Sequence, residues 1–303
     1  MQPVFRDSNQ HRPLQARRQK QVPESLPEAN RGGGGACRCC LLMLPQVVPL
    51  LLLPPLLLLL PARETTALPR TLTDDGLDAA ADAVRRDGFV ILQGVLPPAK
   101  LTRIRQAFGP VLAARLARAG PDRGPGRYYA TPPFVPPFFD PEIFQHPDIL
   151  GVVQRLVGND AVMCQWAADT PHFGSKFQDI HRDAAPLFPE AGIPEPPVTQ
   201  LAVNFPLVAV LPPTDSRPSN GPFEMANATQ LLSVAEGQAL IDSGSVELKP
   251  AYMELGDVMV RDVRGLHRGT PNLTPEPREM VTPGILTAIP QSILSSYLAV
   301  VLT

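Results

Sequence analysis

The chain has 303 residues, of which 27 are lysine or arginine and 29 are aspartate or glutamate, giving a net charge of -2. This length can bury a sizeable core. The near-neutral charge argues against a general nucleic-acid-binding surface. Four cysteines, three of them clustered near residue 40, are too few for a disulfide scaffold. We therefore expect a folded protein without nucleic acid as its partner.

The N-terminal part differs in composition from the rest. Residues 1–40 are rich in arginine, glutamine, proline and glycine, and we interpret them as a disordered basic leader. Residues 41–62 carry no charge and have the length of a membrane span, but they are interrupted by Pro45, Pro49, Pro54 and Pro55. Three interpretations stay open: a signal or signal-anchor segment, part of an organelle transit peptide, or a low-complexity leader without an anchoring role. We expect an intracellular protein, with membrane contact or organelle targeting through residues 1–62 left open.

Residues 71–303 are predicted to form the folded domain. A helix is expected to begin at Thr73 and to end at Gly88, because apolar residues recur between them at helical spacing. The apolar run 88–92 predicts a strand. A second helix follows Pro98, and its arginines fall largely off the apolar stripe. That position predicts a solvated face rather than a nucleic-acid-binding patch.

The next segment, 120–146, is irregular and rich in aromatic residues, which include Tyr128, Tyr129, Phe134, Phe138 and Phe139. Such a segment is typical of a substrate wall or lid and equally of a loop pinned on the core. A short helix is predicted at 147–157. Strands are predicted at 161–168, 177–183, 198–210, 245–249, 256–262, 266–270 and 278–288, with one helix at about 229–242. Short strands at this spacing indicate an antiparallel sandwich or barrel.

A candidate metal site lies in the predicted strand 177–183. On a strand, residues two apart point to the same face, so His181 and Asp183 would direct an imidazole and a carboxylate to one point. His267 follows an apolar strand late in the chain and is the candidate third ligand, with His172 as the alternative. Two histidines and one carboxylate with open positions form the facial triad of non-haem Fe(II) oxygenases.

Arg278 stands eleven residues after His267, at the start of the last predicted strand. Its guanidinium can bind a carboxylate through two hydrogen bonds. The acid would be 2-oxoglutarate, whose distal carboxylate pairs with the arginine while its C1 carboxylate and 2-oxo group chelate the metal. Nearby, Asp262 and Arg264 are predicted to form a structural pair, and Cys164 is predicted to be a small core residue.

In order and spacing, these motifs resemble the phytanoyl-CoA dioxygenase family of Fe(II)/2-oxoglutarate-dependent oxygenases. The resemblance covers residues 73 to about 282. It is carried by Gly88–Leu92, His181-Arg182-Asp183, Asn220-Gly221-Pro222, Gly256-Asp257, His267-Arg268-Gly269 and Arg278. It implies a mainly β fold with flanking helices, a cupin-like jelly roll known as a double-stranded β-helix.

The resemblance also implies roles for single residues. His181, Asp183 and His267 match the iron ligands of the family, Arg278 matches its 2-oxoglutarate-binding arginine, and Gln165 is similar to a position that often contacts the cosubstrate. No catalytic side chain beyond the metal ligands is implied.

The chain departs from the family pattern at three places. Glu224 to Gln230 replace a Gly-Ser-His ending that shapes the pocket rim, so the substrate is not assigned. Gly269 stands where many members have serine, which implies a shifted or absent cosubstrate hydrogen bond. Pro283 and Gly284 follow the arginine closely, which implies a replaced or shortened last strand.

The leading hypothesis is a dioxygenase that hydroxylates an aliphatic carbon of a small organic or acyl substrate, with dioxygen as co-reactant. Two hypotheses from other classes remain. One is a catalytically decayed jelly-roll binding or scaffold protein that is tethered by its leader. The other is a cupin-like metal hydrolase or isomerase that uses the same ligands with zinc. Arg278 argues against the latter, because a zinc hydrolase has no need for a keto-acid anchor. The oligomeric state is not assigned.

Overall fold

The computed structural model describes residues 71–184 and 197–287. The predicted leader and the predicted apolar segment 41–62 lie outside these ranges. The helices are α1 (Asp74–Asp87), α2 (Pro98–Arg118), α3 (Pro141–Phe144), α4 (Pro147–Val157) and α5 (Val234–Asp242). The strands are β1 (Phe89–Leu92), β2 (Arg127–Ala130), β3 (Val162–Pro171), β4 (Gln200–Pro206), β5 (Phe223–Ala226), β6 (Leu248–Ala251), β7 (Val258–Asp262), β8 (His267–Gly269) and β9 (Met280–Leu286). Within these ranges, no helix combines the length and apolar character that crossing a membrane requires.

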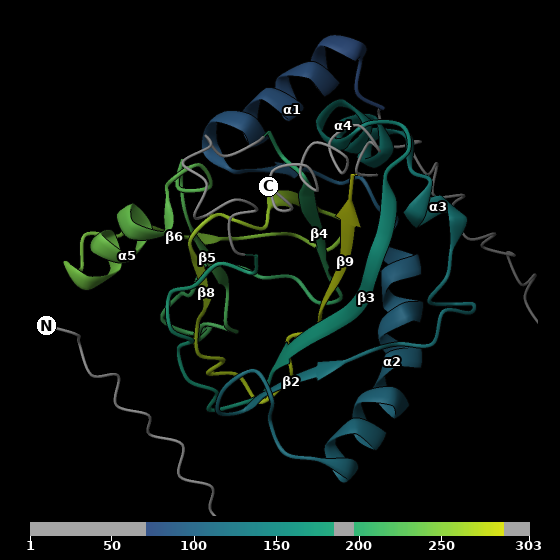
Figure 1. The fold of residues 1–303 in the computed structure, drawn as a ribbon. Coiled ribbons are helices and arrows are strands. Elements are labelled where there is room, and N and C mark those ends of the chain that lie inside the picture. Colours follow the sequence, from purple (N-terminus) through teal and green to yellow (C-terminus); the bar gives the residue numbers. More distant parts are fainter. Residues whose placement is uncertain (1–70, 185–196, 288–303) are drawn as a thin grey trace, which may run out of the picture. The chain divides into compact units, whose positions relative to one another are not determined.

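The strands form two antiparallel sheets (Figure 1). The larger sheet has the strand order β1-β7-β4-β9-β3-β2, and the smaller one has the order β6-β5-β8. The neighbours β2 and β3, and likewise β5 and β6, are consecutive strands along the chain, whereas every other neighbouring pair has further strands between its two members. The predicted mainly β class with flanking helices is confirmed.

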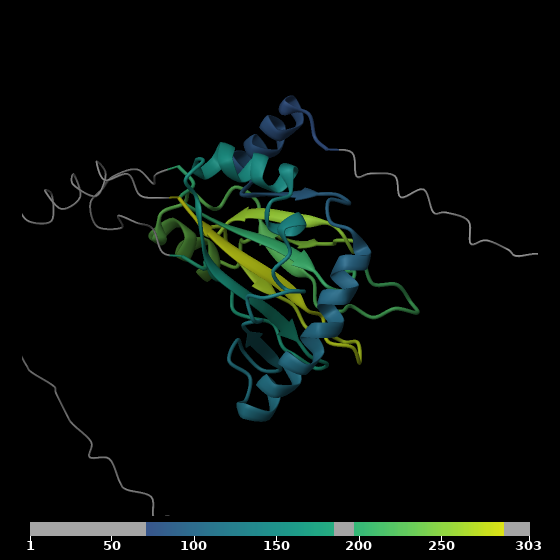
Figure 2. The same cartoon turned by 90° about the vertical axis from the view of Figure 1, so that its right-hand side faces the viewer.

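The large sheet has one face toward the helices and one toward a cavity. On β4, Leu201, Val203 and Phe205 enter the main hydrophobic core together with apolar residues of α2. The alternating residues Ala202 and Asn204 line the cavity instead. This division follows from the period of two in a strand. The helix α2 lies along the sheet in Figure 2 and covers its outer face.

The first two helices form as their sequences predict. Thr73 caps α1, because its hydroxyl accepts a hydrogen bond from the Gly76 amide. The buried stripe of α1 includes Leu77 and Val84, and the helix packs against α4 at the top of Figure 1. Pro98 occupies the first turn of α2, where its missing N–H leaves no helical hydrogen bond unmade.

Two strands were not predicted, and one prediction was wrong. β2 lies inside the irregular segment 120–146 and pairs with the end of β3, and β5 forms the centre of the small sheet. The segment 177–183 is not a strand. His181 makes a single bridge with His267, while Gln178 and Asp183 donate their amides to Gly269 and Val263. These hydrogen bonds to residues between Val263 and Gly269 are unevenly spaced, so no continuous ladder of strand pairing forms.

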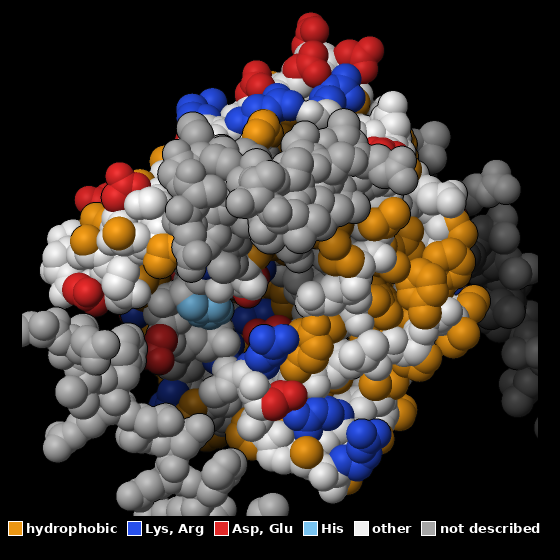
Figure 3. Space-filling model, in the orientation of Figure 1, with side chains coloured by type: hydrophobic (Ala, Val, Ile, Leu, Met, Phe, Trp, Pro, Cys, Tyr) orange, Lys and Arg blue, Asp and Glu red, His pale blue; other side chains and the backbone are white. Residues whose placement is uncertain are grey.

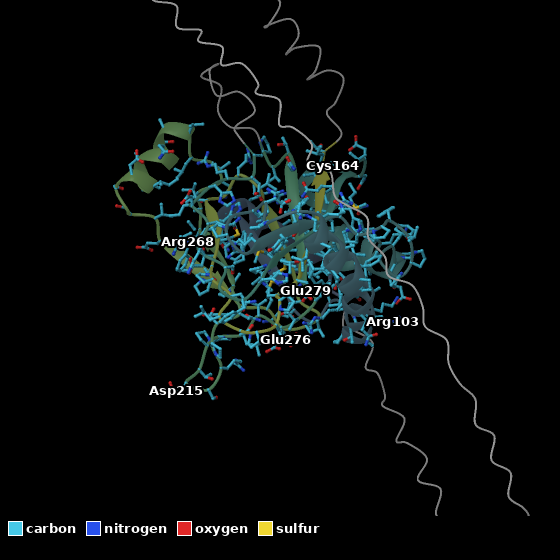
Figure 4. The ribbon with its side chains drawn as sticks, turned by 90° about the horizontal axis from the view of Figure 1, so that it is seen from below. Arg103, Cys164, Asp215, Arg268, Glu276 and Glu279 are labelled. Atoms are coloured by element: carbon cyan, nitrogen blue, oxygen red, sulfur yellow. The ribbon has the colours of Figure 1, made fainter. Side chains whose placement is uncertain are left out.

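Two further expectations are corrected. Cys164 is exposed rather than buried, and Figure 4 shows it at the edge of the folded part. β2 reaches only as far as the residue opposite Ala168, so the start of β3 has a strand neighbour on the β9 side alone. The last strand is not shortened at Pro283, because β9 continues to Leu286 and pairs with both β3 and β4.

Candidate metal and cosubstrate site

Three side chains that can bind a metal come together from two distant segments. His181 and Asp183 belong to the irregular segment after β3, and His267 is the first residue of β8. Asp183 Oδ1 lies 3.8 Å from His181 Nε2 and 3.5 Å from His267 Nε2. One ligand atom from each residue lies within 4.8 Å of the other two, so the group could hold one metal ion. The structure thus assembles the trio that the sequence singles out.

Both imidazoles present Nε2 to the cluster. His181 Nδ1 lies 2.7 Å from the Asp179 carbonyl oxygen, and His267 Nδ1 lies 2.9 Å from the Gly265 carbonyl oxygen. Because a carbonyl oxygen only accepts hydrogen bonds, each Nδ1 carries the proton and donates. In the neutral ring, the lone pair is then on Nε2, which faces Asp183 and can bind a metal. A backbone partner behind the ring is the usual way in which a metal-binding histidine is oriented.

Asp183 has a different partner on each oxygen. Oδ1 faces the two histidines, whereas Oδ2 accepts a hydrogen bond of 2.5 Å from Arg261 Nη2. Burial alone would raise the pKa of Asp183, but the charge of Arg261 and its hydrogen bond to Oδ2 outweigh it and hold the pKa well below its usual range. The carboxylate is therefore ionised at ordinary pH, with one oxygen left for a cation.

The two histidines differ in exposure. The side chain of His267 is 3% exposed, and that of His181 is 38% exposed. Burial and then the charge of Arg261 lower the pKa of His267, although Asp183 opposes them. The neutral ring is the form that binds a metal. The site thus offers two imidazole nitrogens and one carboxylate oxygen and leaves further coordination positions open, which fits non-haem iron better than a closed structural zinc site.

The three side chains open into a cavity of about 190 Å³ between the two sheets. Figure 3 shows a hollow with a histidine side chain at its rim and with acidic and basic side chains around it. The lining includes residues from both sheets, among them Phe223 of β5, Arg261 of β7, Asn204 of β4, Thr282 of β9 and Gln165 of β3. A small molecule in this cavity would touch the candidate metal ligands and the inner face of the large sheet.

Arg278 lies just before β9, lines the same cavity and is almost fully buried. Its Nε and Nη2 both donate to the Gly221 carbonyl oxygen, at 3.1 and 2.8 Å. Gly221 has a φ of +84°, and a Cβ there would lie 3.0 Å from the Thr270 carbonyl oxygen, so the turn that holds the arginine requires glycine. Burial lowers the pKa of Arg278 to about 10, against the attraction of Asp169. The guanidinium remains a cation at neutral pH.

Gln165 lies in the exposed mouth of the cavity, unlike the buried Arg278. Its Nε2 donates to the Tyr129 hydroxyl at 2.5 Å, which leaves Oε1 and the second N–H of the amide for other partners. The contact of Gln165 with a cosubstrate stays a prediction. Of the aromatic residues in 120–146, Tyr129 lines the cavity while Phe138 is buried in the core. Each interpretation of that segment therefore holds for part of it.

The structure also separates residues that are not part of the site. His172 lies outside the three-residue cluster and packs edge-on against Tyr128. Asp262 and Arg264 form the predicted structural pair, with Arg264 Nη2 at 2.7 Å from Asp262 Oδ2. Both of these side chains are buried.

Sequence reasoning missed several cavity residues, chiefly Arg261, Asn204 and Asp169. The sequence does contain one indication that Arg261 faces a polar site. Arg261 interrupts the apolar strand 256–262, and it alternates with Val260, which faces the main core. A charged residue at an inward position of such a strand indicates a polar site. Asn204 and Asp169 carry no comparable signal, because their neighbours along the chain leave the facing side undecided.

Comparisons with known proteins agree with this geometry. A sequence model described as phytanoyl-CoA dioxygenase (PhyH) matches residues 84–280. Among solved structures, the epimerase SnoN from nogalamycin biosynthesis, in complex with Fe3+, alpha ketoglutarate and nogalamycin RO, is 20% identical over 71% of this chain and 85% of that chain, with a TM-score of 0.57. The carbocyclase SnoK from the same biosynthesis is 19% identical over 72% and 87%, with a TM-score of 0.54.

A third solved structure is EctD from S. alaskensis with 2-oxoglutarate and 5-hydroxyectoine. It is 18% identical over 71% of this chain and 78% of that chain, with a TM-score of 0.51. At these identities, the three likenesses support the jelly-roll fold alone, and they confirm the fold that the sequence predicts.

Proposed function

Because the chain belongs to the phytanoyl-CoA dioxygenase (PhyH) family, we propose that it hydroxylates an aliphatic carbon of a small organic or acyl substrate. Family membership makes it a non-haem Fe(II)/2-oxoglutarate-dependent oxygenase-type enzyme. The reaction outcome and the residue roles are the proposal. One observation carries it: His181 Nε2, His267 Nε2 and Asp183 Oδ1 converge in a cavity that a buried arginine also lines.

In this proposal His181, Asp183 and His267 hold Fe(II), and Arg278 binds the distal carboxylate of 2-oxoglutarate. Bound together, the metal and the keto acid supply the oxidising chemistry that activates dioxygen and removes hydrogen from the substrate. The backbone carbonyl partners orient both imidazoles so that Nε2 faces the metal position, and Arg261 stabilises the ionised form of Asp183. No general base is needed, which agrees with the absence of a nucleophile motif in the sequence.

The remaining lining is suited to excluding water and to orienting a substrate. Phe223, Val263 and Met280 present apolar surface to the cavity. Gln165 and Tyr129 present a hydrogen-bonded polar pair at its mouth. A small organic molecule with an aliphatic carbon directed at the metal site fits such a mixture of apolar wall and a few polar groups.

The fold neighbours include an epimerase and a carbocyclase, so the product has to be identified. The experiment is a mass-spectrometric screen of the full chain with Fe(II), 2-oxoglutarate and a metabolite extract. The succinate released and the mass change of consumed compounds are both recorded. Hydroxylation adds one oxygen atom, ring closure removes two hydrogen atoms, and epimerisation leaves the mass unchanged. Succinate release with any result other than an added oxygen would contradict the hydroxylation.

The ligand roles are tested by substitution. His181→Ala, Asp183→Ala and His267→Ala should each abolish iron-dependent succinate release and leave the circular dichroism spectrum largely unchanged, because none of these side chains builds the main core. His172→Ala is the matched control, since His172 lies outside the cluster, and it should retain activity. If His267→Ala kept its Fe(II) affinity, the third ligand would have to be sought elsewhere.

The role of Arg278 is tested by a change that keeps its charge. Lysine loses the planar fork that binds a carboxylate through two hydrogen bonds. Each lost hydrogen bond to a charged group costs about 1.5–3 kcal/mol, or about tenfold or more in affinity. Arg278→Lys should therefore raise the apparent KM for 2-oxoglutarate by at least about tenfold while Fe(II) binding stays nearly unchanged. An unchanged KM would remove the keto-acid anchor from the proposal.

A further inference from the structure

Arg261 lies in the cavity and has one guanidinium nitrogen without a partner. Its side chain is only 4% exposed. Nε donates to Asn204 Oδ1 at 3.1 Å, and Nη2 donates to Asp183 Oδ2 at 2.5 Å. Nη1 is buried and makes no hydrogen bond within the described ranges. The residue therefore presents one unused charged donor inside the candidate site.

The position of this donor is fixed by its surroundings. The guanidinium lies over the ring of Phe223, with Cζ 4.9 Å from the ring centroid. Across the sheet, Arg261 is in register with Ala202 of β4, whose small side chain leaves space above the arginine. With two nitrogens already bonded and one face stacked, the side chain is held before any ligand arrives, which lowers the entropy cost of binding.

A buried charged donor without a partner is costly, because it loses its hydration and gains no hydrogen bond. Such a group in a cavity therefore indicates a ligand atom that accepts from it. Arg278 lines the same cavity, and its recorded hydrogen bonds use Nε and Nη2. The cavity thus holds two buried guanidinium groups, of which Arg261 is the one that contacts a candidate metal ligand.

We propose that Arg261 Nη1 binds the carboxylate of 2-oxoglutarate that chelates the metal, so that an arginine holds the cosubstrate at each end. This inference rests on the proposed function, in which Arg278 binds the distal carboxylate. The C1 carboxylate then lies beside the metal and its ligand Asp183, which Arg261 contacts directly. Arg261 also keeps Asp183 Oδ2 occupied, so that Asp183 offers the metal a single oxygen.

A pair of ligands separates the two arginines in an experiment. In 2-oxopentanoate, a methyl group replaces the distal carboxylate of 2-oxoglutarate, while the C1 carboxylate and the 2-oxo group are kept. The full chain is saturated with Mn(II), and metal occupancy is checked by electron paramagnetic resonance. The affinity for each ligand is then measured by isothermal titration calorimetry in the wild type, Arg261→Met and Arg278→Met.

The expected pattern differs between the two variants. Arg261→Met should weaken both ligands by the same factor, at least about tenfold, because both carry the carboxylate that it binds. Arg278→Met should weaken 2-oxoglutarate by a similar factor and leave 2-oxopentanoate unchanged. Arg261→Lys is a second variant that keeps the positive charge beside Asp183 but lacks the fork. It too should weaken both ligands.

Arg268→Met is the matched control. Arg268 neighbours His267 on β8, but it pairs with Glu224 at 2.7 Å and stacks on Phe177 outside the cavity lining. Figure 4 shows it on the opposite side of the molecule from Arg103 of α2. Its removal should change neither affinity. If Arg268→Met lost as much affinity as Arg261→Met, removing any nearby arginine would disturb the site, and the inference would be wrong.

The failures of the inference and of the proposed function are distinguishable. If Arg261→Met and Arg261→Lys bound 2-oxopentanoate as tightly as the wild type, Arg261 would not contact the C1 carboxylate, and its free nitrogen would serve an oxygen of the primary substrate instead. The proposed function would be untouched. If the Mn(II)-loaded wild type bound neither ligand, the proposed function itself would fail, and this inference would fail with it.

Discussion

Gly269 lies where the buried side chain of Arg127 and the half-buried side chain of Gln178 leave no room for a third. A Cβ at this position would lie 2.5 Å from Arg127 Nη1 and 2.6 Å from Gln178 Oε1. Arg127 is fully buried and donates to the carbonyl oxygens of Lys176 and Thr270. At the position where the family resemblance implies a serine, the chain therefore accommodates an arginine from β2.

This close approach makes Gly269→Ala a sharp test of packing at the residue scale. The new methyl group would have to displace a buried guanidinium or a hydrogen-bonded amide, and overpacking of this kind costs about 1–3 kcal/mol. We expect the urea midpoint to fall accordingly. Gly120→Ala is the control, because nothing lies within 4 Å of the added Cβ. Equal midpoints for the two variants would show that Arg127 moves aside freely.

At the scale of elements, α4 begins with a histidine that can cap it only when neutral. His146 Nδ1 accepts a hydrogen bond of 3.3 Å from the Asp148 amide. A protonated ring has no acceptor. Burial lowers the pKa of His146, and Asp148 opposes this only in part. In the folded state His146 is therefore protonated only at a lower pH than in the unfolded chain, where its pKa is about 6.5.

The sign of the pH dependence follows. As the pH falls below about 6.5, the unfolded chain protonates His146 first, so the free energy of unfolding decreases, by up to about 1.4 kcal/mol per pH unit. His146→Asn keeps a good cap without a titrating group. We expect urea denaturation between pH 7.5 and 5.5 to show a shallower decrease for this variant. Parallel curves for the two proteins would contradict a neutral cap.

The second helix carries a proline within its span. Pro110 lies inside α2 and is exposed, and a proline in a helix interior costs about 3 kcal/mol relative to alanine. The proline also restricts the unfolded chain, which recovers about 0.4–1 kcal/mol. Pro110→Ala should therefore raise the free energy of unfolding by about 2–3 kcal/mol. Pro98→Ala, in the first turn of the same helix, should be nearly neutral, and a gain of similar size there would refute the explanation.

At the scale of the whole molecule, the described residues that line the cavity lie between Arg123 and Gly284. Residues 1–70 lie outside the described ranges, and none of the candidate site residues belongs to them. We predict that deleting them changes localisation and leaves succinate release and the affinity for 2-oxoglutarate unchanged. Turnover and calorimetry on the two purified proteins would test this. A truncated protein that folds and fails to turn over would contradict it.

Much of the candidate site could be predicted from the sequence, because chemical type and spacing are local properties. His181, Asp183, His267 and Arg278 were identifiable without coordinates, and the family resemblance supplied the jelly roll. The reason that His181 and Asp183 converge was different from the expected one. They do not lie on a strand. The backbone of His181 is hydrogen-bonded to His267 of β8, and the Asp183 amide donates to the Val263 carbonyl oxygen.

The sequence by itself determined which residues can bind a metal and a carboxylate, where α1 begins and ends, where α2 begins, and which strand residues are apolar. Only the tertiary structure decided that Arg261 contacts Asp183, that Arg127 fills the space beside Gly269, and that Cys164 is exposed. The physical reason is the range of each effect. Capping and alternation act within a few residues of the chain. Ion pairs, close approaches and sheet edges depend on how β2, β7 and β8 pack against strands far away in sequence, and no local pattern specifies that packing.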